Sequence, residues 1–173
     1  MKNIAKKLKG LLKNKDIFDI IIFGSVTKGK IDPGDIDIAC ILHTMNKGIK
    51  PHITSSIPKA DVQILTIEDM HKPIFLTLIK EGYSVREGKY LHEIYGIQPV
   101  KLYTYSLKQL TNSNKVMFER GIKNIQGITR LSNRVILVPI QKSAEFDEFL
   151  KRWDLDIEAK EYELLPLLRK EEI

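Results

Sequence analysis

Three aspartates are spaced so that a folded chain could bring their carboxylates together. Asp35 and Asp37 are two residues apart at the start of an apolar stretch, and Asp61 begins a second such stretch. Residues i and i+2 of a strand point to the same face, so the first two carboxylates would repel each other unless a cation binds between them. If the two strands are neighbours, Asp61 joins the pair, and three carboxylates can hold two Mg²⁺ ions. The alternative is that these aspartates only end strands or hold turns.

Gly24 and Ser25 follow a buried apolar stretch, at a point where a short helical turn can begin. Glycine lets the backbone approach a ligand closely. The serine hydroxyl and the free N–H groups of the next turn can hold a phosphate. Lys28 and Lys30 add positive charge nearby. The pattern predicts a phosphate-binding loop, although a serine that merely caps a turn would look the same.

A P-loop is the competing interpretation of this segment. Gly24, Gly29 and Lys30 match the first seven positions of that motif, which also follows a strand. Ile31, however, stands where the motif has a serine or threonine. Asp32-Pro33-Gly34 would then end any helix, whereas a P-loop must begin a long one. The sequence therefore disfavours a P-loop.

Hydrophobic periodicity places these residues on predicted elements. Apolar, β-branched stretches predict strands at 17–23, 35–42 and 61–65, and helical spacing predicts an amphipathic helix over 3–14. Two prolines and Gly48 predict a connecting loop over 43–59. Thr66 is expected to cap a helix that ends at Gly82 and whose apolar face comprises Met70, Ile74, Leu78 and Ile79.

A second region begins near Gln98. Its pattern predicts a strand over 101–105, a helix capped by Thr111 or Ser113, a strand over 134–140 and a helix capped by Ser143. We expect a domain over 1–97 and a small α+β extension over 98–173. The pattern leaves open whether this extension is a separate subdomain or continues the first sheet.

Charge is distributed unevenly along the 173 residues, whose net charge is +6. Residues 98–152 carry ten basic and four acidic side chains, whereas 153–173 carry three and seven. A basic surface favours polyanions, and Tyr103 and Tyr105 beside Lys108 are a mixture that can stack on and bind RNA. The alternative is a half-buried sheet edge with a solvated, lysine-rich face. Leu164, Leu165, Leu167 and Leu168 of the acidic tail could dock on a partner or on the protein's own core.

Composition also bounds the location. The longest uncharged apolar run, over 20–23, is too short to span a bilayer, and the basic N-terminus is not followed by the apolar core of a secretory signal. The single Cys40 excludes an internal disulfide framework and a cysteine-rich zinc site. We therefore expect a cytoplasmic protein with no membrane partner.

The chemistry-bearing residues together resemble the DNA polymerase β-like nucleotidyltransferase superfamily. The resemblance rests on Phe23-Gly24-Ser25, nine intervening residues, Asp35-Ile36-Asp37-Ile38, and a third carboxylate at Asp61. Val26-Thr27-Lys28-Gly29 and Lys80-Glu81-Gly82-Tyr83 are similar to segments of its minimal archaeal and bacterial members. The resemblance covers about residues 1–95 and implies a nucleotidyltransferase fold, a mixed β-sheet flanked by helices.

The resemblance also implies a reaction and residue roles. Asp35, Asp37 and Asp61 would bind metal and be catalytic, with Asp61 helping to deprotonate the attacking hydroxyl. Gly24, Ser25 and Lys28 would bind the nucleotide. The enzyme would use Mg²⁺ to transfer a nucleoside monophosphate from an NTP to a hydroxyl on a protein, an RNA or a small molecule, releasing pyrophosphate. The alternative is a non-catalytic nucleotide- or RNA-binding, antitoxin-like protein on the same fold, which uses its basic 98–152 region.

Overall fold

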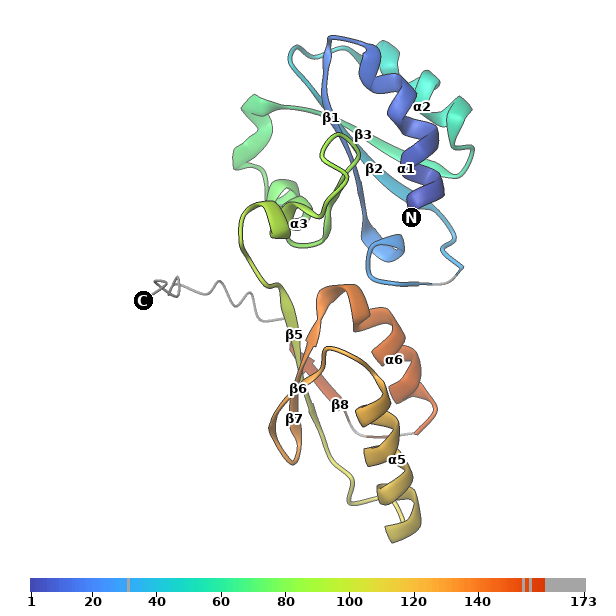
Figure 1. The fold of residues 1–173 in the computed structure, drawn as a ribbon, viewed down its shortest axis with the longest axis vertical. Helices are drawn as coiled ribbons and strands as arrows, with labels where there is room; N and C mark the ends of the chain where they lie inside the picture. Colours follow the sequence, from blue (N-terminus) through green and yellow to red (C-terminus); the bar gives the residue numbers. More distant parts are fainter. Residues whose placement is uncertain (31, 154, 156, 161–173) are drawn as a thin grey trace. The chain divides into compact units, whose positions relative to one another are not determined.

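The computed structural model describes residues 1–30, 32–153, 155 and 157–160. These residues divide into two compact units, Met1–Ile97 and the described residues from Gln98 onward. Each unit has its own four-stranded sheet (Figure 1). The second region is therefore not a continuation of the first sheet, which settles one question that the sequence left open.

The sheet of the first unit has the strand order β3-β2-β1-β4. Its strands are β1 (Ile17–Phe23), β2 (Ile36–Leu42), β3 (Ala60–Thr66) and β4 (Tyr83–Ser84). β1 pairs antiparallel with both β2 and β4, whereas β2 and β3 run parallel. The sheet is therefore mixed, and the three longer strands confirm the predicted strand positions.

Helices cover both faces of this sheet (Figure 1). They are α1 (Lys2–Lys9), α2 (Lys50–Ser56), α3 (Pro73–Glu81) and α4 (Leu91–Ile94), with 3₁₀ turns η1 (Gly10–Lys13), η2 (Gly24–Val26), η3 (Lys47–Ile49) and η4 (Ile67–His71). Leu8 of α1 and Ile53 of α2 pack against Ile20, Ile22 and Ile38 on one face. On the other face, Leu78 of α3 packs against a second cluster comprising Ile21, Phe23, Ala39, Ile41 and Leu65. Successive residues of each strand thus pack into the clusters on opposite faces of the sheet, as strand geometry requires. The predicted α/β class is confirmed.

Three details of the predicted elements are wrong. Residues 43–59 are not only a loop, because they contain α2, whose first turn accommodates Pro51 where proline costs no hydrogen bond. The helix expected over 3–14 ends as α-helix at Lys9 and continues as the 3₁₀ turn η1. Thr66 caps η4 rather than α3, in a reciprocal capping box with Asp69. Met70 therefore lies before α3 and is 66% exposed, so it is not part of the apolar face.

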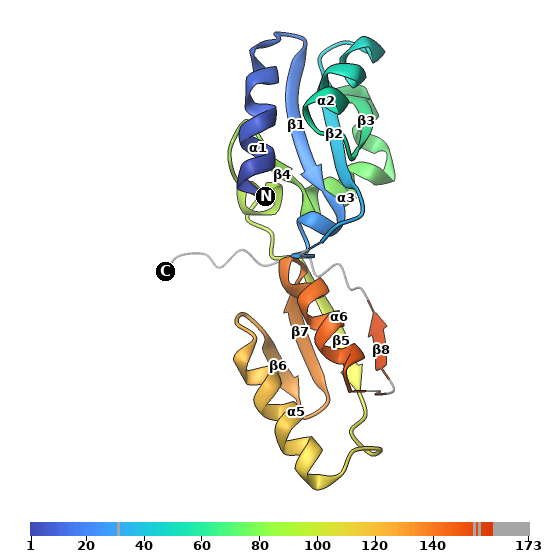
Figure 2. The same ribbon diagram turned by 90° about the vertical axis from the view of Figure 1, so that its right-hand side faces the viewer.

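The second unit is an antiparallel sheet of order β6-β7-β5-β8 with two helices on one face (Figure 2). Its elements are β5 (Val100–Tyr105), α5 (Asn112–Asn124), β6 (Thr129–Ser132), β7 (Val135–Pro139), the 3₁₀ turn η5 (Ile140–Lys142), α6 (Ser143–Lys151) and β8 (Ile157–Lys160). The hydroxyl of Thr111 accepts the N–H of Asn114 and caps α5, as predicted. Ser143, in contrast, is the first residue of α6, and its hydroxyl donates to the carbonyl of Ile140. The arrangement is α+β, as expected.

The two tyrosines considered for RNA stacking lie in the core of the second unit. Tyr103 is fully buried and Tyr105 is 4% exposed. Their rings pack edge-on against Phe146 and Phe118. Among the neighbouring bases, Lys101 pairs with Asp147 and Arg130 with Glu119. The predicted mixture of aromatics and bases is therefore not available for stacking, because the aromatic half fills the core. The leucines at 164–168 lie outside the described residues.

Candidate active site

The strand register brings the three aspartates to one corner of the first sheet. Asp37 and Asp61 are direct partners across the parallel pair of β2 and β3. Adjacent strands lie about 4.8 Å apart and partnered residues share a face, so the two carboxylates project side by side. Asp35 precedes Asp37 by two residues, in the bend that enters β2. These side chains lie on the face that α3 covers, where Ala39 and Ile41 continue the same row.

The carboxylates at this corner act on one another electrostatically. The pKa of Asp37 is raised, first by burial and then by the negative charges of Asp35, Asp61 and Glu81, while Lys28 opposes the shift. Like charges raise a carboxyl pKa only when they lie within several ångströms. The corner therefore concentrates negative charge, with one lysine as a partial counter-charge.

Gly24 allows the loop after β1 to pass directly over this corner. Its backbone has φ of +76°, and a Cβ atom there would lie 1.9 Å from Oδ2 of Asp37. Any other residue would collide with that carboxylate and would also be strained in the left-handed region. Phe23 and Asp37 are partners across the antiparallel pair of β1 and β2, which sets this close approach. The loop and the carboxylates therefore form one structure.

The loop itself is a short, closed turn. The carbonyl of Gly24 accepts the N–H groups of Thr27 and Lys28 at 3.2 and 3.3 Å. The carbonyl of Ser25 accepts the N–H group of Lys30 at 3.1 Å. Within the described residues, the hydroxyl and the N–H of Ser25 have no hydrogen-bond partner, so they are available to a ligand. No helix follows Lys30, and the chain enters β2 antiparallel to β1. The P-loop interpretation is therefore wrong.

Glu81 is a fourth carboxylate at this corner, and no role was predicted for it. It is the last residue of α3 and is 5% exposed. Its Oε2 lies 2.7 Å from the ammonium of Lys28, and its Oε1 accepts the N–H of Gly24 at 3.3 Å. At Gly82, a Cβ would lie 2.4 Å from the carbonyl of Leu78, so glycine ends the helix tightly. Two sequence signals point to it: an acidic residue directly before a glycine helix stop, and the similarity of Lys80-Glu81-Gly82-Tyr83 to a segment of the minimal nucleotidyltransferases.

A comparison with known protein families shows which family this chain belongs to. A model of the nucleotidyltransferase domain matches residues 1–123. The chain belongs to the nucleotidyltransferase domain family. The match covers the whole first unit and ends within α5 of the second, so it extends beyond the resemblance seen in the sequence. No curated protein matches the chain.

Membership gives this nucleotidyltransferase domain a general function in nucleotidyl transfer, for which NTP and a divalent metal are the family's usual substrate and cofactor. Among the described residues, no three His, Cys, Asp or Glu side chains are already gathered tightly enough to hold a metal ion. The donor set nevertheless fits one. It consists of carboxylate oxygens, which Mg²⁺ prefers, and the pKa of Asp37 is raised first by burial and then by neighbouring negative charges that a cation would neutralise.

The remaining candidates of the nucleotidyltransferase domain are structural. Cys40 is fully buried in β2, and burial followed by the charge of Asp19 raises the pKa of its thiol to about 12. It is therefore a core residue, as predicted.

Membrane-spanning helices were also sought in the described ranges, and none of the helices there has the length and apolar character that a span needs.

Asp19 anchors the segment that follows Glu81. It is 6% exposed in β1, and its carboxylate accepts the hydroxyl of Ser84 and the N–H groups of Ile20 and Arg86, the latter two at 2.7 and 3.1 Å. Burial raises its pKa, and these hydrogen bonds oppose the shift only in part. The carboxylate thus joins β4 and the turn after it to β1 at the cost of a buried charge.

Asp19→Asn is therefore expected to fold at least as stably as the wild type at pH 7. The amide oxygen can accept both N–H groups, and the amide nitrogen can donate to Ser84. Because the pKa of Asp19 is raised in the folded state, the wild type loses stability relative to this variant as the pH rises from about 4 towards 7. Urea unfolding at both pH values measures this difference.

Asp19→Leu, which leaves the donors unpaired, is the control and should lower the free energy of unfolding by at least about 2 kcal/mol. A gap between Asp19→Asn and wild type that does not change with pH would contradict the prediction.

Proposed function

We propose that the first unit is a Mg²⁺-dependent enzyme that transfers a nucleoside monophosphate from an NTP to a hydroxyl acceptor and releases pyrophosphate. The observation that carries the proposal is the register of Asp37 with Asp61 beneath the Gly24–Ser25 loop. This arrangement supports the proposal, because carboxylate oxygens that would hold a metal and a turn that would hold a phosphate lie at one corner of one sheet.

Each residue at the corner has a proposed task. Asp35, Asp37 and Asp61 would hold the metal, and bound Mg²⁺ would supply charge neutralisation for the phosphates and for the transition state. Ser25 would donate its hydroxyl and N–H to the β- and γ-phosphates, which fixes the leaving group. Glu81 holds Lys28 and the N–H of Gly24, so it keeps the loop in shape before the nucleotide arrives.

The proposed reaction is a single in-line displacement. The acceptor oxygen forms a bond to the α-phosphorus, and the bond from that phosphorus to the pyrophosphate oxygen breaks. Asp61 accepts the hydroxyl proton, because it is exposed on the edge strand β3 beside Asp37. The acceptor class covered by the proposal is a hydroxyl on a protein, an RNA or a small molecule.

Thermal unfolding tests the proposal directly. Mg²⁺ with NTP is expected to raise the melting temperature, since a ligand present at about 100 times its Kd stabilises the folded state by about 2.7 kcal/mol. The Asp35→Ala, Asp37→Ala double variant should stay folded and lose the increase. A matched Asp16→Ala, Asp32→Ala variant removes two exposed aspartates instead and should keep it. Equal stabilisation of the wild type and the Asp35, Asp37 variant would place the ligand elsewhere.

Nucleotide affinity should depend on Ser25 more than on Lys30. Lys30 is exposed beyond the turn, and a screened surface charge is worth about 0–1 kcal/mol. Lys30→Ala should therefore weaken the binding of Mg²⁺-ATP or Mg²⁺-GTP by less than about tenfold. Ser25→Ala, and still more Ser25→Val, should weaken it further because the hydroxyl is a direct donor. Isothermal titration compares the three variants, and a silent Ser25→Ala beside a non-binding Lys30→Ala would refute the assigned loop.

A further inference from the structure

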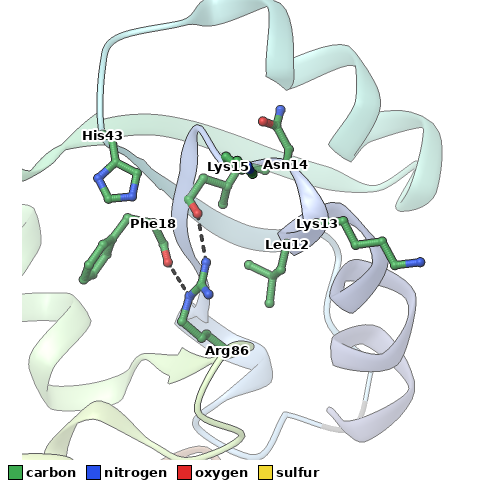
Figure 3. A pocket seen from close by; sticks show the side chains of 8 residues that line it. Leu12, Lys13, Asn14, Lys15, Phe18, His43 and Arg86 are labelled. Carbon is green, nitrogen blue, oxygen red and sulfur yellow. Dashed lines mark hydrogen bonds between the residues drawn. The ribbon is translucent and has the colours of Figure 1, made fainter.

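A second concave site lies at the other end of β1 from the candidate active site. It is a cavity of about 410 Å³ (Figure 3). It is lined by Leu12, Lys13, Asn14, Lys15, Ile17, Phe18, His43 and Arg86. Ile17 begins β1, whereas Gly24 follows its end. Seven residues of strand rise about 3.3 Å each, so the two sites are roughly 20 Å apart.

One wall of this cavity is held rigidly. The guanidinium of Arg86 donates from Nε to the carbonyl of Phe18 at 2.5 Å and from a terminal nitrogen to that of Ile17 at 2.9 Å (Figure 3). Its own backbone N–H is bound by the buried Asp19. Arg86 therefore keeps its charge in the wall, where two of its five guanidinium N–H donors bind backbone carbonyls.

The opposite side offers charge and an aromatic surface. The lining includes three cationic side chains and no carboxylate. Lys13 and Lys15 are exposed, and neither makes an ion pair within the described residues. The ring of Phe18 is 46% exposed and meets His43 edge-on, with centroids 5.6 Å apart. Leu12 and Ile17 add apolar surface.

We propose that this cavity binds a nucleotide, either free or as one residue of a single-stranded RNA. A flat base would stack on the open face of Phe18, because aromatic side chains hold bases in this way irrespective of their sequence. The phosphate would be bound by the ammonium groups of Lys15 and Lys13, with the exposed Lys13 side chain, which points away from Phe18 in Figure 3, turning towards the ligand. The cavity volume lies within the range of small-molecule sites. An aromatic ligand without a phosphate would leave the two lysines without a partner.

A titration followed by NMR tests the proposal. AMP and a six-nucleotide RNA are added separately to the full chain at low salt, in EDTA, so that the metal-dependent site does not contribute. We expect the amide signals of 12–18 and 43 to shift saturably, while those of 24–29 do not. Shifts with both probes show that a free nucleotide is sufficient, and shifts with RNA alone assign the site to a nucleotide within a strand. If neither probe shifts residues 12–18, the proposal is wrong.

Matched variants separate a site from general attraction to a basic protein. Lys13→Gln with Lys15→Gln, and Phe18→Leu separately, should each weaken binding at least about fivefold. Lys2→Gln with Lys6→Gln removes the same charge from exposed positions of α1 and should change affinity less than twofold. Equal losses in the two lysine pairs would overturn the proposal. Phe18→Leu replaces an exposed ring, so we expect it to stay folded, and circular dichroism is the check.

Discussion

Replacing Asp37 with asparagine is expected to reduce nucleotidyl transfer by about 10³-fold or more, the size of effect seen when a charge-stabilising or proton-transfer group is removed. The amide keeps the shape of the side chain but removes a negative charge from the corner formed with Asp35 and Asp61. The rate is measured as pyrophosphate released from Mg²⁺-NTP, with an RNA, a protein and a simple alcohol supplied in turn as acceptor.

The same substitution should stabilise the metal-free protein. Burial and three neighbouring carboxylates raise the pKa of Asp37, so its ionised form is unfavourable in the folded state and costs stability as the pH rises. Asp37→Asn is therefore expected to melt higher than the wild type in EDTA at pH 7. Asp32→Asn, an exposed change in the same loop, should alter neither rate nor melting temperature. An active Asp37→Asn enzyme would rule out the proposed site.

Lys28→Met is expected to lower the free energy of unfolding by about 2–3 kcal/mol, because it leaves a buried carboxylate without its counter-charge. The side chain of Glu81 is 7% exposed, and its 2.7 Å partner is itself 33% exposed, so the loss should fall below that of a fully buried pair. Adding Glu81→Gln should recover at least half of the loss. The double variant is therefore predicted to be more stable than Lys28→Met alone, as measured by urea unfolding.

Lys72 offers a matched control for this prediction. Its ammonium also lies 2.7 Å from a carboxylate, that of Asp69, but it is 53% exposed. Lys72→Met should therefore destabilise the protein clearly less than Lys28→Met does. If both lysine variants lower the free energy of unfolding equally, the burial of Glu81 does not determine how much its ion pair with Lys28 stabilises the protein. A large loss at Lys28 would also mean that a nucleotide phosphate must compete with Glu81 for this ammonium.

Much of the first unit follows from local sequence. The β-branched stretch of β1 and the alternation in β2 are strand signals that tertiary packing supports rather than overrides. The spacing of Asp35 and Asp37 predicts a shared face, and the parallel register with β3 places Asp61 beside them. The metal-binding and catalytic roles of these residues stay predictions.

Other features depend on contacts that no local pattern encodes. Glu81 reaches Gly24 from 57 residues away, and only the packing of α3 on the sheet brings them together. Leu102 and Tyr103 point to opposite faces of β5, and only the position of α6, whose Phe146 packs on Tyr103, shows which face is buried. Met70 has helical spacing from Ile74. It lies in η4, however, which Thr66 caps and which ends at His71, before α3 begins at Pro73.

The antiparallel pairing of β1 with β2 has a consequence for how the corner assembles during folding. Gly24, Ser25, Asp35 and Asp37 all belong to one hairpin, whose closure spans few residues and carries a small entropic cost. Asp61 arrives only after the crossover through α2, and Glu81 later still. The Gly24–Ser25 loop and two carboxylates can therefore take shape as an early local nucleus, while the repulsion of Asp37 by Asp61 and Glu81 is added only as the longer-range contacts form.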